Sequence, residues 1–242
     1  MTRAPRLPVI FCFAGQGSQY YRMGADLLDS DPVFRQWMRA GDALVARRHG
    51  FSLIAEIYGG GHRPGQPFDR LAASHPAIFL VQYALAKVMQ HHRVRPDQVL
   101  GVSLGEFTAQ AVAGMIDFEA ALEAVSDQPA LFARACPPGG MIAVLGPPEL
   151  HARLPVLARK SEIAGINSAG HFVLSAPAED LEAVEAALRA ADVPCQRLPV
   201  PPPFHSRFID GAEALCRAAM TGGRRESPFW PVWSCCAAAP VG

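Results

Sequence analysis

The first part of the chain has the apolar and polar spacing expected of short strands and amphipathic helices. Residues 7–14 are apolar and end at a glycine, which predicts a buried strand. Residues 15–19, Gly-Gln-Gly-Ser-Gln, predict a tight loop. A helix is expected to follow through Met23, Leu27 and Leu28.

A longer helix is predicted to start at Asp31-Pro32, because proline is favoured at the first helical position. Residues 59–67 are polar and rich in glycine and proline, which predicts a mobile loop. The next helix has Pro76 near its start, a stripe of apolar residues, and a basic end at residues 91–93, His-His-Arg, that suits the helix dipole. Neighbouring histidines do not share one side of a helix, so no metal site is expected there.

A serine lies between the next predicted strand, residues 98–101, and a helical pattern over residues 106–112. Residues 101–105, Gly-Val-Ser-Leu-Gly, have the spacing G-x-S-x-G, which places a serine on a sharp turn from a strand into a helix. Because the predicted strand and helix supply this context, the pattern indicates that Ser103 is a nucleophile.

The pattern of apolar and polar residues changes between residues 140 and 200. Patterns typical of strand, helix, strand, strand, helix and strand follow one another, which is the ferredoxin-like order. A small inserted subdomain is therefore predicted at residues 137–198. The large core is predicted to comprise residues 1–136 and 199–242.

Composition excludes several classes of protein. Half of the 242 residues are hydrophobic, and 22 basic side chains balance 22 acidic ones, so nothing favours binding to nucleic acid. The first apolar run is too short to span a membrane and lacks a signal-peptide cleavage pattern. Six cysteines without paired spacing favour free thiols, and a cytoplasmic protein is expected.

A serine hydroxyl is a weak nucleophile until a base removes its proton, so Ser103 needs a histidine. The chain has eight histidines, and spacing alone leaves the choice open. His205 is a good candidate, because the prolines before it would stiffen the chain where it returns from the small subdomain to the large core.

Five segments occur together and in order over nearly the whole chain: FAGQGSQYYRMG, GVSLGEFTAQAVAGMIDF, GGMIAVLG, INSAGHFVLSA and PPFHSRF. They resemble the malonyl-CoA:ACP transacylase family, which includes the acyltransferase domains of polyketide and fatty-acid synthases. The resemblance implies an α/β fold, with an α/β-hydrolase-like large domain and an inserted ferredoxin-like small subdomain.

The resemblance also implies roles for individual residues. Ser103 matches the nucleophile that becomes an acyl-enzyme, and His205 matches the base that activates it. The backbone N–H groups of Gln16 and Leu104 match the oxyanion hole; without the resemblance, Gln16 is an ordinary turn residue. Asn167 matches an Asn-Ser turn near the family's active site, where a supporting role and a plain hairpin role stay equally open.

The sequence departs from malonyl-using members at a decisive position. Gln128 stands where those members carry an arginine that binds the free carboxylate of the malonyl unit, and a neutral amide cannot replace that charge. Arg134 lies six residues later and should face elsewhere on a helix. Pro129 should start a new helix or kink the old one. Val102 replaces a histidine before the serine, which also favours an uncharged acyl group.

Two further residues complete the expected acyl-binding set of Gln128, Val102, Phe204 and His75. Phe204 precedes the predicted base in PPFHSRF. His75 falls where relatives often carry glutamine; it is either a pocket histidine or, the favoured interpretation, a surface residue at a helix start.

These features predict an acyl-enzyme mechanism on short, non-carboxylated acyl thioesters in polyketide-type biosynthesis. Hydrolysis, a proofreading role, is slightly favoured over transfer of acetyl or longer acyl groups to a carrier. A non-catalytic module that binds carrier proteins is the alternative of another class, and an ordinary lipase or esterase is disfavoured by the Gly-Gln-Gly loop. No bound cofactor or metal is expected, since the substrate carries the phosphopantetheine thioester.

The expected partners are acyl carrier protein with its acyl-phosphopantetheine arm and acyl-CoA, with neither nucleic acid nor membrane. A chain that starts at Met1 without a fused domain predicts a stand-alone, trans-acting protein. Family members continue beyond the segment that matches the end of this chain, with a glycine-rich turn whose carbonyl orients the catalytic histidine. Without that turn, His205 would be held less well or oriented by another carbonyl.

Overall fold

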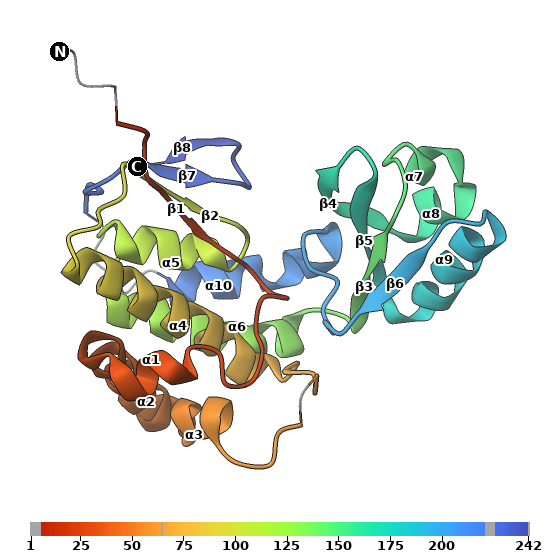
Figure 1. Ribbon diagram of the computed structural model, residues 1–242. Helices are drawn as coiled ribbons and strands as arrows, with labels where there is room; N and C mark the ends of the chain where they lie inside the picture. The colour runs from red at the N-terminus through yellow and green to blue at the C-terminus, as the bar shows by residue number, and fades with distance from the viewer. Residues whose placement is uncertain (1–5, 64, 221–225, 242) are drawn as a thin grey trace. The chain divides into compact units, whose positions relative to one another are not determined.

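A computed structural model describes residues 6–63, 65–220 and 226–241, so position 64 of the predicted 59–67 loop and the outermost residues of the predicted core lie outside the described residues. The chain forms two compact units (Figure 1). The first unit comprises Met1–Pro129 and Ala219–Gly242, and the second unit comprises Ala130–Ala218.

The first unit contains a four-stranded sheet in the order β1-β2-β7-β8. Strands β1 (Ile10–Phe13), β2 (Gln98–Gly101) and β7 (Val232–Ser234) are parallel, and β8 (Ala239–Val241) pairs antiparallel with β7. The register pairs Phe13 with Gly101, so the loops after β1 and β2 leave the sheet at the same edge. The predicted loop and elbow therefore lie side by side.

Helices lie beside this sheet (Figure 1). Helix α5 contacts β1, β2 and β7, and helix α4 packs against α5 and α2. The helices of this part of the chain are α1 (Ala25–Ser30), α2 (Pro32–His49), α3 (Leu53–Tyr58), α4 (Leu71–His91), α5 (Gly105–Val112) and α6 (Phe118–Ala135). The predicted start of α2 is confirmed: the Asp31 side chain accepts a hydrogen bond from the Phe34 N–H at 2.8 Å, and Pro32 is the first helical residue.

Helix α4 forms the centre of the first unit's core. Its buried side chains, Ile78, Phe79 and Leu80 among them, pack with Phe34 and Met38 of α2. By length and composition α4 is apolar enough to cross a membrane, but 67% of that window is buried inside the structure, as in the core helix of a globular protein.

Three predictions for the first unit need correction. The predicted buried strand 7–14 is only the four-residue β1, and Ile10 is 48% exposed because no strand among the described residues pairs with the outer edge of β1. The helix expected through Met23 begins only at Ala25, after Gly24 in a left-handed conformation. Helix α6 continues through Pro129, so the alternative in which a new helix starts there is wrong.

The second unit contains an antiparallel sheet in the order β4-β5-β3-β6. Its strands are β3 (Gly139–Val144), β4 (Glu162–Ser168), β5 (His171–Pro177) and β6 (Cys195–Leu198), and helix α9 (Ala178–Ala190) packs on them. Across the sheet, the strands numbered along the chain follow the order 2-3-1-4. Helices come after the first and third strands, which confirms the ferredoxin-like arrangement.

The first helix predicted for the small subdomain is instead two short helices, α7 (Leu150–Arg153) and α8 (Pro155–Lys160), because Pro155 cannot donate the hydrogen bond that would continue α7. The second unit also extends beyond the predicted 137–198. It includes the 3₁₀ helix η1 (Arg207–Ala212) and most of α10 (Glu213–Ala219), because residues 199–218 pack on the same unit.

Candidate active site

The elbow forms where β2 ends and α5 begins. Ser103 stands between them with φ +54°, a left-handed conformation that few residues with a side chain adopt. Such a conformation costs on the order of 1–3 kcal/mol and persists only where the surrounding structure fixes it. The strained serine is therefore held by its two neighbouring elements.

The two glycines of G-x-S-x-G are required by close backbone contacts. A Cβ on Gly101 would lie 2.4 Å from the Glu106 backbone nitrogen. A Cβ on Gly105 would lie 2.1 Å from the Phe13 carbonyl oxygen at the end of β1. Glycine at both positions lets α5 start directly over the sheet.

The Gly-Gln-Gly loop lies against this elbow. A Cβ on Gly15 would lie 2.6 Å from the Val102 carbonyl oxygen and 3.1 Å from the Ser103 Cβ. The side chain of Gln16 donates to the Ser74 hydroxyl of α4 at 3.4 Å. The first unit thus brings Gln16, Val102, Ser103 and Leu104 together.

Two backbone amides in this region suit an oxyanion hole. Within the described residues, the N–H groups of Gln16 and Leu104 donate no backbone hydrogen bond. Leu104 precedes the first residue of α5, so its amide adds to the partial positive charge of that helix end. Both donors remain available to a developing oxyanion, although their role there is a prediction.

Two polar residues near the elbow were missed by the sequence analysis. Gln82 of α4 bonds both backbone polar groups of Ala14, directly before the Gly-Gln-Gly loop. Glu106 in the first turn of α5 accepts hydrogen bonds from the Ser234 hydroxyl at 2.7 Å and the Cys236 N–H at 3.1 Å. The signal for Gln82 was its place as a polar residue within the apolar stretch of α4.

His75 is not the surface residue that was favoured. It is 3% exposed, because α4 begins at Leu71, four residues earlier than His75, and carries it into the core. Burial lowers the pKa of His75 to about 4, so the imidazole is neutral at pH 7. It neighbours Ser74, which binds Gln16, so it lies close to the Gly-Gln-Gly loop.

His205 lies in the second unit, in a segment held on both sides. The Ser175 hydroxyl donates to the Phe204 carbonyl oxygen, and the Phe204 ring meets Phe132 edge-on at 5.1 Å. The Ser206 hydroxyl donates to the Pro203 carbonyl oxygen at 2.6 Å. His205 itself has φ +56° and an exposed side chain, while Phe204 is buried. The segment therefore presents the imidazole on a fixed backbone.

Gln128 lies on α6 in the first unit and is half-buried, and its side chain makes no hydrogen bond within the described residues. Its neighbour Asp127 accepts from the Arg48 guanidinium at 2.8 and 2.6 Å, which occupies that carboxylate. Arg134 is exposed six residues further along the same helix, which places it on another face. Val102 beside the serine is 46% exposed.

Asn167 lies at the end of β4, next to the hairpin turn into β5. Its side-chain nitrogen lies 3.4 Å from His171 Nδ1 across that hairpin. This contact stabilises the hairpin turn, which is one of the two roles that the sequence left open for Asn167. A supporting role in the reaction stays a prediction.

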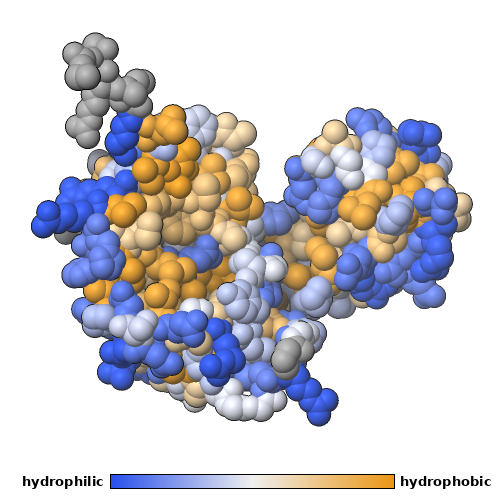
Figure 2. All heavy atoms as spheres, in the orientation of Figure 1, coloured by the Kyte–Doolittle hydropathy of each residue, from blue (hydrophilic) through white to orange (hydrophobic). Residues whose placement is uncertain are grey.

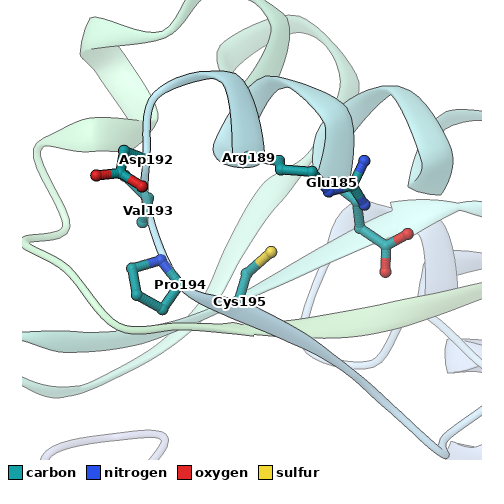
Figure 3. A pocket seen from close by; sticks show the side chains of 6 residues that line it. All are labelled: Glu185, Arg189, Asp192, Val193, Pro194 and Cys195. Atoms are coloured by element: carbon teal, nitrogen blue, oxygen red, sulfur yellow. The ribbon is translucent and has the colours of Figure 1, made fainter.

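The second unit also has a hollow of about 330 Å³ between the end of α9 and the start of β6 (Figure 3). None of the predicted site residues lines it, and burial raises the pKa of its Cys195 thiol, which disfavours the reactive thiolate. Glu185 at its rim is paired with Arg197. The lining residues are Glu185, Arg189, Asp192, Val193, Pro194 and Cys195.

Comparison with known proteins decides the family. The protein-family model for the acyl transferase domain matches residues 10–240 of this chain. The chain belongs to the acyl transferase domain family. Membership in this family supports the prediction that the chain is an enzyme.

The relatives are proteins of polyketide biosynthesis. The acyltransferase homolog BaeD of Bacillus velezensis is 42% identical over 93% of this chain and 69% of its own length. The homolog PksD of Bacillus subtilis is 41% identical over 94% of this chain and 70% of its own length. The matched part of this chain thus covers about 70% of the length of these two relatives.

Solved structures agree with this assignment. A loading acyltransferase of the avermectin polyketide synthase has a TM-score of 0.85 at 28% identity, over 96% of this chain and 74% of that one. A malonyl-transacylase in complex with its acyl-carrier protein has a TM-score of 0.82 at 27% identity, over 93% of this chain and 74% of that one. This likeness confirms the predicted fold class.

Proposed function

We propose that this acyltransferase forms an acyl-enzyme on Ser103 from short, uncharged acyl thioesters of acyl carrier protein in polyketide biosynthesis. The main observation in support of an acyl-enzyme is the strained backbone of Ser103, which has φ +54° on a strand–turn–helix elbow against which Gly15 packs. A strained serine at such a turn presents its hydroxyl away from both elements. The named polyketide relatives support the pathway class.

His205 is the proposed base. As Ser103 Oγ attacks the thioester carbonyl carbon, the imidazole takes the hydroxyl proton. The amides of Gln16 and Leu104 donate to the oxyanion of the tetrahedral intermediate. The C–S bond then breaks, and the imidazolium returns its proton to the departing phosphopantetheine thiolate.

The acyl group is proposed to be uncharged because of Gln128. A buried malonyl carboxylate requires a cation, and Gln128 offers only a neutral amide. The nearby Arg48 is already bonded to Asp127. Val102, Phe204 and the neutral His75 are proposed to complete an apolar acyl pocket.

Hydrolysis is the proposed second half-reaction. His205 takes a proton from water as the water attacks the carbonyl carbon of the Ser103 ester. The imidazolium returns that proton to Ser103 Oγ as the C–O bond breaks and the free acid leaves. Transfer to a second carrier thiol is the competing function, and the acyltransferase names of the relatives favour it. Both need acyl carrier protein as partner, as in the solved transacylase complex, and both would operate in the cytoplasm with no cofactor beyond the substrate's phosphopantetheine arm.

Intact mass spectrometry tests this proposal. The protein is mixed with acetyl-, butyryl- or malonyl-carrier protein, with and without a second, unloaded carrier. An acetyl adduct on the wild type that is absent from Ser103→Ala supports the acyl-enzyme, and free acid without loading of the second carrier supports hydrolysis. Ser126→Ala is the matched control, since Ser126 is a buried serine within α6 whose hydroxyl, among the described residues, bonds only the Leu122 carbonyl oxygen. Turnover by Ser103→Ala, or preferential malonyl loading, would overturn the proposal.

A further inference from the structure

We propose that Gln82 is a positioning residue that sets the conformation of the Gly-Gln-Gly loop by binding both backbone polar groups of Ala14. The Gln82 Oε1 accepts from the Ala14 N–H at 2.7 Å, and the Gln82 Nε2 donates to the Ala14 carbonyl oxygen at 3.0 Å. The Nε2 also donates to the Ile78 carbonyl oxygen at 3.1 Å, one turn earlier in α4. This third bond fixes the side chain to its own helix.

The two hydrogen bonds from Gln82 to Ala14 take the place of the hydrogen bonds that a neighbouring strand would make at this edge of the sheet. Phe13 faces β2, since its carbonyl oxygen accepts from the Val102 N–H at 3.0 Å. Successive residues of a strand direct their polar backbone groups to opposite edges, so Ala14 faces the outer edge. No strand among the described residues pairs with that edge. The carboxamide supplies one acceptor and one donor there, as a peptide group would.

Gln82 also ends an apolar groove along the outer edge of β1. The groove has a volume of about 250 Å³, and Figure 2 shows hydrophobic residues gathered on the face of the first unit that carries β1. Its other lining residues are Ile10, Phe11, Cys12, Phe13, Leu85, Ala86 and Met89. A glutamine among such residues is explained by the two bonds it makes to Ala14.

The consequence lies one residue further along the chain. Gly15 follows Ala14 and packs against the Val102 carbonyl oxygen, with no room for a side chain. Gln16 comes next, and its side chain donates to Ser74 of α4. Helix α4 therefore holds the loop at two points, before and after Gly15. Resting on the proposed function, Gln82 then places the Gln16 N–H for the oxyanion without touching the substrate.

Three variants test this assignment. Gln82→Met keeps the length of the side chain and removes both bonds to Ala14. Gln82→Glu keeps the acceptor for the Ala14 N–H but, when ionised, sets a second acceptor against the Ala14 carbonyl oxygen. Gln90→Met is the matched control on the same helix, because Gln90 Nε2 has no hydrogen-bond partner among the described residues.

The first readout needs no activity. Hydrogen–deuterium exchange of the segment that contains Ala14 should be at least fivefold faster in Gln82→Met than in the wild type, and unchanged in Gln90→Met. Equal exchange in the wild type and Gln82→Met would overturn the proposal. Because this readout uses no substrate, it decides the role of Gln82 even where Ser103 forms no acyl-enzyme and the proposed function fails.

The second readout is the rate of acetyl transfer from acetyl-carrier protein to Ser103, as a ratio to the wild type at each pH. Gln82→Met should lower kcat about tenfold or more with KM within twofold. The Gln82→Glu ratio should rise as pH falls from 8 to 5, because two facing carbonyl oxygens favour the protonated carboxyl, which donates as the amide does. The Gln82→Met ratio should stay flat. A Gln82→Glu ratio that does not change with pH, or a wild-type kcat in Gln82→Met, would overturn the positioning role.

Discussion

Gly15 approaches Ser103 so closely that a Cβ on the glycine would lie 3.1 Å from the Ser103 Cβ and 2.6 Å from the Val102 carbonyl oxygen. The loop after β1 and the elbow after β2 are therefore one packed unit. A backbone oxygen cannot turn aside as a flexible side chain can, so Gly15→Ala must displace either the loop or the elbow.

We expect Gly15→Ala to lower the free energy of unfolding by about 1–3 kcal/mol, as overpacking does, and to slow acylation of Ser103 at least tenfold. Urea unfolding and intact mass measure the two effects. Gly170→Ala is the control, because a Cβ there has nothing within 4 Å. Wild-type acylation by Gly15→Ala would show that the contact does not set the elbow.

The strain at Ser103 predicts a conflict between stability and activity. With φ +54°, the position favours glycine over any residue with a Cβ. The free energy gained by relieving the backbone strain exceeds the entropic cost of ordering a glycine on folding. Ser103→Gly should therefore be about 1 kcal/mol more stable than Ser103→Ala. Both variants should be inactive, because both lack the hydroxyl.

Ser126 provides the matched comparison in chemical denaturation. It lies within α6, where glycine is unfavourable, so Ser126→Gly should be about 1 kcal/mol less stable than Ser126→Ala. Equal stability of the two Ser103 variants would mean that the elbow holds no strain.

The elbow could be predicted from the sequence because its determinants are local. Gly101, Ser103 and Gly105 are close in the chain, and the strand and helix beside them have clear patterns. The ferredoxin-like order of the second unit was predictable for the same reason, since each of its strands and its long helix α9 is a continuous local segment.

Contacts between distant segments could not be predicted in this way. Gln82 meets Ala14 across 68 positions of the chain, and only the packing of α4 beside β1 brings them together. His75 is buried because α4 starts before Pro76, which the position of that proline did not indicate. The exposure of Ile10 depends on which strands pair with β1, and a single apolar run carries no information on its neighbours.

The buried His75 predicts acid sensitivity. Its folded pKa of about 4 lies below the usual 6.5, so between these values the unfolded chain binds a proton that the folded chain excludes. The contribution of the neutral His75 side chain to the free energy of unfolding is fully present above pH 6.5 and is lost as the pH falls towards 4. At pH 5 the loss is about 2 kcal/mol.

Urea unfolding at pH 7 and pH 5 measures this effect. His75→Gln should lose about 2 kcal/mol less than the wild type between these pH values, because the amide does not titrate. Gln90→Met, which replaces a side chain of the same helix that does not titrate, is the control and should keep the wild-type dependence. The same pH dependence in His75→Gln and the wild type would contradict the burial argument.

The identity of residue 128 predicts a change in substrate. If Gln128 lines the acyl pocket, Gln128→Arg gives a free carboxylate a charge-assisted partner worth about 1.5–3 kcal/mol, or about a ten- to hundredfold gain. Malonyl loading of Ser103 should therefore rise by that factor relative to acetyl loading, as measured by intact mass after brief incubation with each acyl-carrier protein. Arg134→Gln is the control: it removes a cation from an exposed position on another face of α6 and should leave the malonyl-to-acetyl ratio unchanged. An unchanged ratio in Gln128→Arg would place residue 128 outside the pocket, and a fall in malonyl loading of Arg134→Gln would show that Arg134 already serves the carboxylate.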